Sequence, residues 1–181
     1  RIGLFGGSFD PVHVAHVALA RLALDELALD RLHWMPAGQP WQKERPLTPA
    51  VHRVAMLQHA IAGEPRFVLD RREVDREGLS YTIDSVRELQ AEHPGATLFL
   101  LIGQDQYAAF HTWAKWPELL DRVTLAVATR PGSVASARAD VQQRGHHALP
   151  LPPHDVSATD IRQRVAQGLP IDHLVPPAVA A

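Results

Sequence analysis

The 181-residue chain contains no cysteine, only two lysines, and a formal net charge of -2. The missing cysteines exclude a disulfide scaffold, an iron–sulfur site and a thiol nucleophile, and they give no sign of export. The small net charge does not favour binding to nucleic acid or to a membrane surface. Apolar runs are shorter than a membrane span, and we expect no signal peptide. We therefore expect a cytoplasmic enzyme with a single domain over residues 1–181.

The most informative stretch lies at the start of the chain. Residues 2–5 form a short apolar run that predicts a buried strand, which two glycines and an Asp-Pro turn then interrupt. From His13 onward, apolar residues recur at helical spacing. A strand, a glycine turn and a helix in this order bring free backbone N–H groups and the positive end of a helix dipole to one point. Such a point suits a phosphate.

Two histidines, His13 and His16, stand in the first turn of this predicted helix. Their spacing puts both imidazole rings on one face, beside the free N–H groups. There they can donate hydrogen bonds to phosphate oxygens. The alternatives are a capping pair or half of a metal site. Because the neighbouring sequence contains neither His-Glu-x-x-His nor a cysteine, we assign no metal ligand.

Strands alternate with helices along the rest of the chain, which predicts an α/β fold: a doubly wound, mostly parallel sheet with helices on both faces. The predicted strands are residues 2–5, 32–36, 67–69, 97–102, 123–128 and 146–151. In such sheets, ligands bind beyond the carboxyl ends of the strands, where the strand order reverses.

Two connecting segments carry more specific predictions. A helix after residue 47 is predicted with Thr48 as its N-cap and Pro49 at its first position. Residues 70–78 are charged, and we expect a solvated connection there. The apolar face of the helix is predicted to consist of Val51, Val54, Ala55, Leu57 and Ile61.

A second anion-binding pattern is Val156-Ser157-Ala158-Thr159-Asp160-Ile161-Arg162. It resembles a capping box at a helix start, and it adds two hydroxyl groups and an arginine to the helix N-terminus. Such a combination suits a polyphosphate, because the hydroxyl and N–H groups donate and the guanidinium supplies bidentate charge. Taken alone, the pattern is better explained by an ordinary capped surface helix, and its pairing with the first motif favours the functional interpretation.

The two patterns together resemble the nucleotidylyltransferase superfamily, whose members join an NTP to a phosphorylated partner and release pyrophosphate. Gly6-Gly7-Ser8-Phe9-Asp10-Pro11-Val12-His13 followed by His16 is similar to the superfamily signature, although Ala15 stands where glycine is usual. The resemblance implies that His13, His16 and Arg162 are catalytic. It implies ATP contacts from Gly6, Gly7, Ser8, Phe9, His16, Lys43, Gly103, Asp105, Ser157, Thr159 and Arg162.

Three further segments narrow the substrate. Ile102-Gly103-Gln104-Asp105, then Thr112-Trp113, together with Ser80-Tyr81-Thr82, resemble the pattern of nicotinate-nucleotide adenylyltransferases. By this resemblance, Asp105 holds a ribose, Trp113 stacks on the pyridine ring, and Thr82 with nearby amides binds the pyridine carboxylate. Lys43 and Arg130 complete the implied mononucleotide contacts. Without the resemblance, Trp113 would be assigned to the core, and Lys43 would be either a phosphate ligand or solvated.

The implied reaction joins ATP and nicotinate mononucleotide to give deamido-NAD and pyrophosphate, with Mg²⁺ bridging the triphosphate. Nicotinamide mononucleotide or another phosphorylated small molecule is an alternative substrate. A non-catalytic nucleotide sensor is a different alternative, suggested by Ala15 and by Trp41-Gln42 in the loop before Lys43. We expect no nucleic-acid or membrane partner. The sequence leaves the oligomeric state open, a homo-oligomer included.

Overall fold

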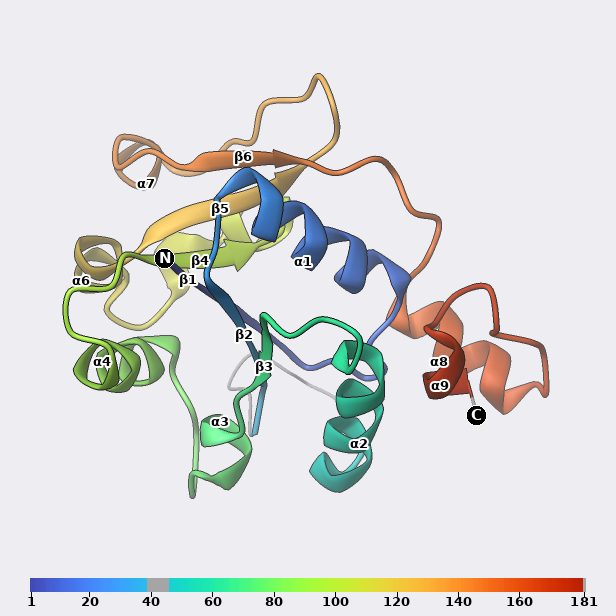
Figure 1. Ribbon diagram of the computed structural model, residues 1–181. Coiled ribbons are helices and arrows are strands. Elements are labelled where there is room, and N and C mark those ends of the chain that lie inside the picture. Colours follow the sequence, from blue (N-terminus) through green and yellow to red (C-terminus); the bar gives the residue numbers. More distant parts are fainter. Residues whose placement is uncertain (39–45, 181) are drawn as a thin grey trace.

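One parallel sheet carries every strand in the described part of the computed structural model, residues 1–38 and 46–180 (Figure 1). Its order is β3-β2-β1-β4-β5-β6, and all neighbouring strands run parallel. All six predicted strands are confirmed, and their ends agree to within two residues. The strands are β1 (Ile2–Gly7), β2 (Arg31–Pro36), β3 (Phe67–Leu69), β4 (Leu98–Ile102), β5 (Thr124–Thr129) and β6 (His147–Pro150).

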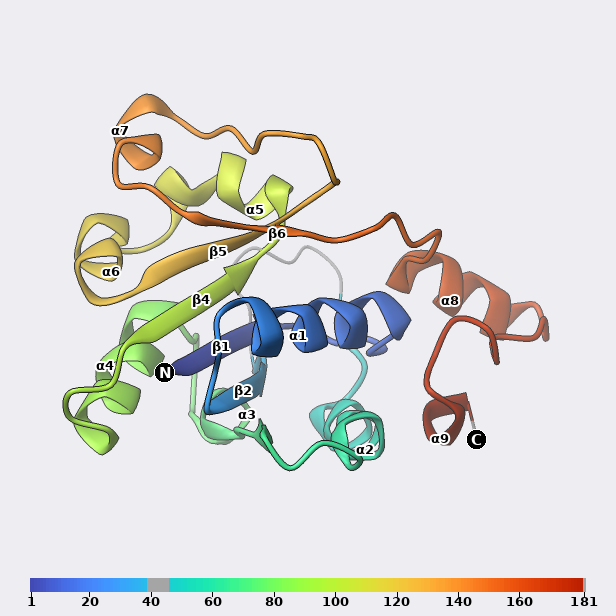
Figure 2. The same cartoon turned by 45° about the horizontal axis from the view of Figure 1, so that its top comes forward.

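Helices cover both faces of this sheet, as the doubly wound prediction requires (Figure 2). Helices α1 and α2 pack on one face, and α4 to α7 pack on the other. The helices are α1 (Val14–Glu26), α2 (Ala50–Ile61), α3 (Arg72–Asp75), α4 (Thr82–Glu92), α5 (Gln104–Ala108), α6 (Trp116–Arg122), α7 (Ala139–Gln142), α8 (Ala158–Ala166) and α9 (Pro177–Ala180). A 3-10 turn, Phe110–Thr112, follows α5.

The centre of the sheet is apolar on both sides because helices cover it twice. All five residues of β4 are buried, which fits the continuous apolar run of its sequence. In the neighbouring strand β1, Gly3 leaves room for two leucines: a Cβ at this position would lie 2.5 Å from Leu32 and 2.6 Å from Leu29. The close packing at Gly3 is therefore against leucines of β2 and of the segment that leads into it.

The strand order reverses between β1 and β4, and this reversal positions the site. From β1 the chain first builds β2 and β3 on one side, and then crosses to build β4, β5 and β6 on the other. The loops that follow β1 and β4 consequently diverge, leaving a crevice at the carboxyl edge of the sheet.

Two local predictions are wrong. Helix α2 has Pro49, not Thr48, at its N-cap, and its buried side includes Arg53 while Val51 is 70% exposed and Ala55 is also exposed. The buried side of the helix is therefore Arg53, Val54, Leu57 and Ile61, so three of the five predicted apolar residues are buried.

Residues 70–78 are not a solvated connection. They contain α3, and Asp70 is buried. The Asp70 carboxylate lies 2.9 Å from Nδ1 of His33 and accepts a 2.8 Å hydrogen bond from Nε of Arg72. The charges of Asp70 and Arg72 are therefore satisfied mainly by partners inside the protein, whereas Arg71 and Asp75 of the same segment are exposed.

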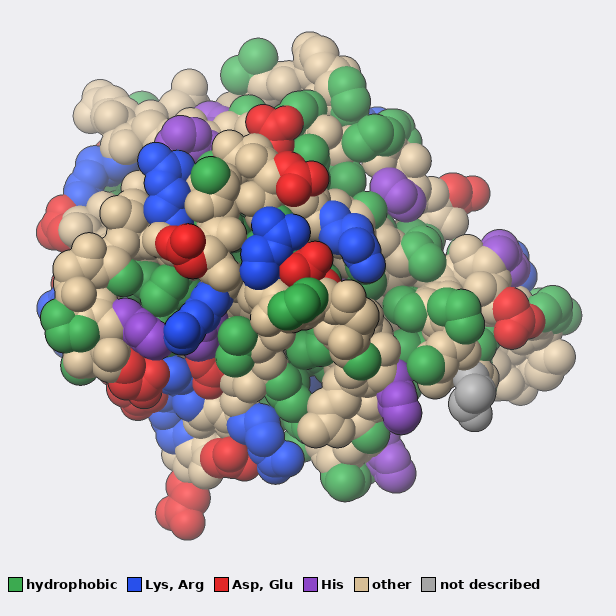
Figure 3. All heavy atoms as spheres, in the orientation of Figure 1, with side chains coloured by type: hydrophobic (Ala, Val, Ile, Leu, Met, Phe, Trp, Pro, Cys, Tyr) green, Lys and Arg blue, Asp and Glu red, His purple; other side chains and the backbone are tan. Residues whose placement is uncertain are grey.

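The surface carries charges of both signs without a continuous patch of either on the face shown in Figure 3. Among the described residues, no helix is long and apolar enough to cross a membrane.

Candidate active site

The two histidines of the first motif form a stacked pair at the start of α1. His13 is the N-cap residue, and its backbone N–H donates a 3.0 Å hydrogen bond to Nδ1 of His16. The two ring centroids are 3.7 Å apart. Because Nδ1 of His16 accepts a hydrogen bond, the proton of the neutral ring must sit on Nε2. Nε2 of His16 is thus a hydrogen-bond donor.

Burial keeps both rings neutral near pH 7. It lowers the pKa of His13 to about 4, with a further contribution from nearby His154. Burial, followed by the proximity of His13, also holds the pKa of His16 well below its usual value. Nδ1 of His13 is buried, and no described residue hydrogen-bonds to it. The pair therefore offers neutral hydrogen-bond donors. A bound anion would raise the pKa of both rings and so favour their protonated, positively charged form.

The second motif reaches the first through Arg162 on α8. Its Nη1 donates a 2.7 Å hydrogen bond to the backbone carbonyl of Asp10, in the loop after β1. Its Nη2 donates a 3.1 Å hydrogen bond to Oγ1 of Thr159. Ser157 caps α8 by accepting from the N–H of Asp160 at 3.1 Å. The two motifs, distant in sequence, thus meet at the start of α1, where Figure 1 shows α8.

Arg53 is a residue that sequence reasoning missed. Only 2% of it is exposed, and it donates to three backbone carbonyls: Thr48 at 2.7 Å, Ala37 at 2.8 Å and Ser8 at 3.0 Å. It therefore joins the loop after β1 to the end of β2 and to the start of α2. The only signal for it in the sequence is an arginine next to the apolar residue Val54.

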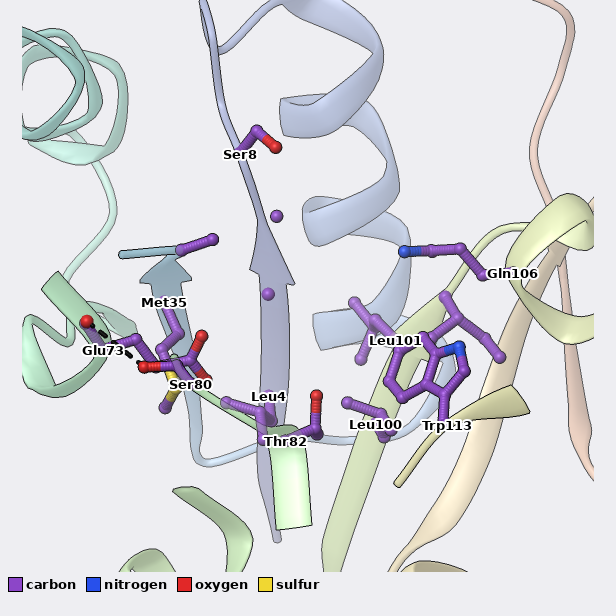
Figure 4. A pocket seen from close by; sticks show the side chains of 14 residues that line it. Leu4, Ser8, Met35, Glu73, Ser80, Thr82, Leu100, Leu101, Gln106 and Trp113 are labelled. Carbon is purple, nitrogen blue, oxygen red and sulfur yellow. Dashed lines mark hydrogen bonds between the residues drawn. The ribbon is translucent and has the colours of Figure 1, made fainter. Parts of the chain in front are cut away.

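A first cavity of about 190 Å³ opens at the carboxyl ends of β1 and β4 (Figure 4). Thr82, at the first position of α4, lies on one side of it, and Trp113 lies on another. The Trp113 ring is supported by Phe110, at 4.9 Å between centroids. The structure thus brings together two residues, Thr82 and Trp113, that the sequence resemblance implied as substrate contacts. Gly6, Gly7 and Ser8 line it as well.

Glu73 is the second residue that sequence reasoning missed, since it lies in the segment interpreted as solvated. Its side chain lines the first cavity beside Ser80 (Figure 4). Burial raises the pKa of Glu73, and a 2.7 Å hydrogen bond from Ser85 Oγ to its Oε2 opposes that rise. A run of charges in the sequence gives no sign of this inward placement.

A second cavity of about 530 Å³ lies at the carboxyl ends of β4 and β5. Gly103, Asp105 and Arg130 line it, together with Ala15 from α1 and His154 from the loop before α8. Arg130 was expected at the mononucleotide with Thr82 and Trp113, but the structure places it at the second cavity, because β5 lies beyond β4 in the sheet.

One predicted ATP contact, Phe9, does not line either cavity. Phe9 is buried in the core, where its ring packs on Phe5, Trp34 and His16 at 5.3, 5.4 and 5.1 Å between centroids. Its contribution to the site is therefore to support the His16 ring. Lys43 lies outside the described residues.

The chain matches the family model described as Cytidylyltransferase-like over residues 4–164. A protein of Methylibium petroleiphilum named probable nicotinate-nucleotide adenylyltransferase is 52% identical over 181 residues, covering 99% of this chain and 85% of that protein. A protein of the same name from Mycolicibacterium vanbaalenii is 37% identical over 186 residues, covering 99% and 87%.

Solved structures share the fold. The Plasmodium falciparum nicotinic acid mononucleotide adenylyltransferase complexed with APC superposes with a TM-score of 0.78, covering 99% of this chain and 92% of that one at 16% identity. Its complex with NaAD gives a TM-score of 0.76 at 16% identity and the same coverage.

Proposed function

We propose that this chain, which belongs to the cytidylyltransferase-like family, is a nicotinate-nucleotide adenylyltransferase. It joins ATP to nicotinate mononucleotide and forms deamido-NAD and pyrophosphate. The observation that carries the proposal is the pair of adjoining cavities at the strand-order reversal, beside a helix start that presents His13 and His16. Two cavities that share a wall, with the start of α1 close to both of them, match a reaction that joins two nucleotides.

The first cavity is suited to the pyridine half. Trp113 offers a flat apolar ring, and the N-terminus of α4 at Thr82 offers N–H groups and a hydroxyl to a carboxylate. The described residues that line this cavity include no arginine or lysine. Recognition of the acid therefore rests on the helix N-terminus. The second cavity, with Asp105 and Arg130, is then left for the adenosine half.

The reaction needs no general base, because the attacking group is the 5′-phosphate of the mononucleotide, an anion at neutral pH. One of its oxygens bonds to the α-phosphorus of ATP, and the bond to the bridging oxygen of the leaving pyrophosphate breaks. His16 donates from Nε2 to the α-phosphate, while Thr159 and Arg162 hold the outer phosphates. Donors fixed before the reaction stabilise the charge that develops without the cost of reorienting. A contact from Lys43 remains a prediction.

ATP enters as its magnesium complex, so the ion belongs to the co-substrate. Within residues 1–38 and 46–180, no three acidic or histidine side chains form a group that could hold a metal ion. Phosphate oxygens and water are accordingly its expected ligands. A cytoplasmic location, a single domain over residues 1–181 and the absence of a nucleic-acid partner remain predictions from the sequence.

The test is to incubate the protein with ATP, Mg²⁺ and nicotinate mononucleotide, and to measure pyrophosphate and the dinucleotide together. We expect both in equal amounts. His16→Ala is expected to reduce turnover by about 10²–10³-fold, as loss of a donor to developing charge does, while the mononucleotide binds nearly as before. ATP binding without pyrophosphate release would support the sensor alternative and refute the proposal.

A further inference from the structure

One side chain lines both cavities. Gln106, on α5, lies at the wall of the first cavity and also at the wall of the second. Of the described residues that line either cavity, it is the only one common to both. A ligand that fills the two cavities at once must pass this side chain.

The orientation of the Gln106 amide is fixed by its own helix. The backbone N–H of Gly103 donates a 3.0 Å hydrogen bond to Oε1 of Gln106. Because an N–H group cannot pair with another N–H group, the atom that faces Gly103 must be the oxygen. The Nε2 group is therefore directed elsewhere, and no described residue accepts a hydrogen bond from it. In Figure 4 the nitrogen of Gln106 points away from α5, to the side on which α1 and β1 lie.

The chemistry of this position suits an oxygen acceptor. An amide N–H pairs with a ribose hydroxyl or a phosphate oxygen, and it adds no charge that would need compensation. The segment of a dinucleotide that lies between its two bases consists of such oxygens. We propose that Gln106 donates from Nε2 to the ribose–phosphate segment that spans the two cavities, and that it thereby couples their occupancy. The inference rests on the proposed function, since it requires a dinucleotide that fills both cavities.

The competing explanation is that Gln106 only caps α5. Gln106→Glu separates the two roles, because a glutamate at this position still accepts from Gly103 but no longer donates from the other end. Gln106→Met removes both the cap and the donor without adding charge. Gln104→Glu is the matched control: the residue lies on the same helix, and its side chain lines the second cavity only.

The experiment measures dissociation constants of three ligands by calorimetry: deamido-NAD, AMP and nicotinate mononucleotide. Free phosphate ends can turn to water or to other donors, whereas the linking segment is held from both sides. We therefore expect Gln106→Glu and Gln106→Met to raise the dissociation constant of deamido-NAD about tenfold or more, and that of either mononucleotide less than about threefold. Gln104→Glu is expected to change the dissociation constants of deamido-NAD and AMP by the same factor.

Two results would overturn the inference. One is wild-type affinity for deamido-NAD in Gln106→Met, because the added charge would then explain any loss in Gln106→Glu. The other is an equal loss for all three ligands in both variants, which indicates a disturbed fold. Failure of the proposed function is seen separately, in a wild-type protein that neither binds deamido-NAD nor releases pyrophosphate with nicotinate mononucleotide.

Discussion

Replacing Arg53 with methionine tests whether this buried cation holds the walls of the first cavity together. The guanidinium donates to the carbonyls of Thr48, Ser8 and Ala37, and the last two residues line the cavity. Methionine keeps most of the apolar stem but leaves three carbonyls without a donor. Each unsatisfied buried group costs about 1–3 kcal/mol, and partial relaxation reduces the sum, so we expect a loss of about 4 kcal/mol.

Urea unfolding measures this loss, which is a large part of the roughly 5–15 kcal/mol that stabilises a typical domain. Arg53→Lys should lie between wild type and Arg53→Met, because one ammonium group cannot span all three carbonyls. Arg66→Met is the matched control, since Arg66 pairs with Glu64 on the surface, and it should unfold like wild type. The folded fraction of Arg53→Met should also show a raised KM for the mononucleotide. If Arg53→Met unfolds at the same urea concentration as Arg66→Met, the reasoning is refuted.

Three other perturbations test separate parts of the site. Ala15→Val adds two methyl groups at the second cavity, so KM for ATP should rise more than tenfold while KM for nicotinate mononucleotide changes little; the reverse would exchange the two cavity assignments. The pKa of His13 is about 4 in the folded protein and about 6.5 in the unfolded chain. The unfolded chain therefore binds more protons below pH 6.5, and the free energy of unfolding decreases as the pH is lowered. When the pH is lowered from 7 to 4.5, the free energy of unfolding measured in urea should decrease by about 2 kcal/mol more in the wild type than in His13→Gln. ATP binding should raise the same pKa, so calorimetry in two buffers at pH 5.5 should show proton uptake; no uptake would place the phosphates away from His13.

Much of the fold could be predicted because its strands are short apolar runs that are bounded by glycine, proline or charged residues. The run ending at Ile102 is apolar throughout because β4 is covered on both faces, and the glycines after Phe5 mark the end of β1. Residues 70–78 could not be predicted in the same way. Their charges pair with His33 and with residues of α4, and those partners become neighbours only when the sheet forms.

The chemistry-bearing residues were likewise predictable where a helix start marks them. His13, His16, Thr159 and Arg162 follow local patterns, and the structure brings both patterns together. The division of the crevice into two cavities was not predictable. It depends on strand order, which sends Arg130 to the second cavity although the substrate pattern grouped it with Trp113.

The measurement that tests the central claim most directly is kcat/KM for pyrophosphate release, with ATP fixed and either nicotinate mononucleotide or nicotinamide mononucleotide varied. Under the proposed function, backbone N–H groups and a hydroxyl at the start of α4 recognise the acid, because Thr82 lines the first cavity and its described lining includes no arginine or lysine. Losing one charge-assisted contact of this kind corresponds to about 1.5–3 kcal/mol, so we predict at least a tenfold preference for the acid. Equal kcat/KM values for the two mononucleotides would contradict the account of the first cavity, and no release with either would contradict adenylyl transfer itself.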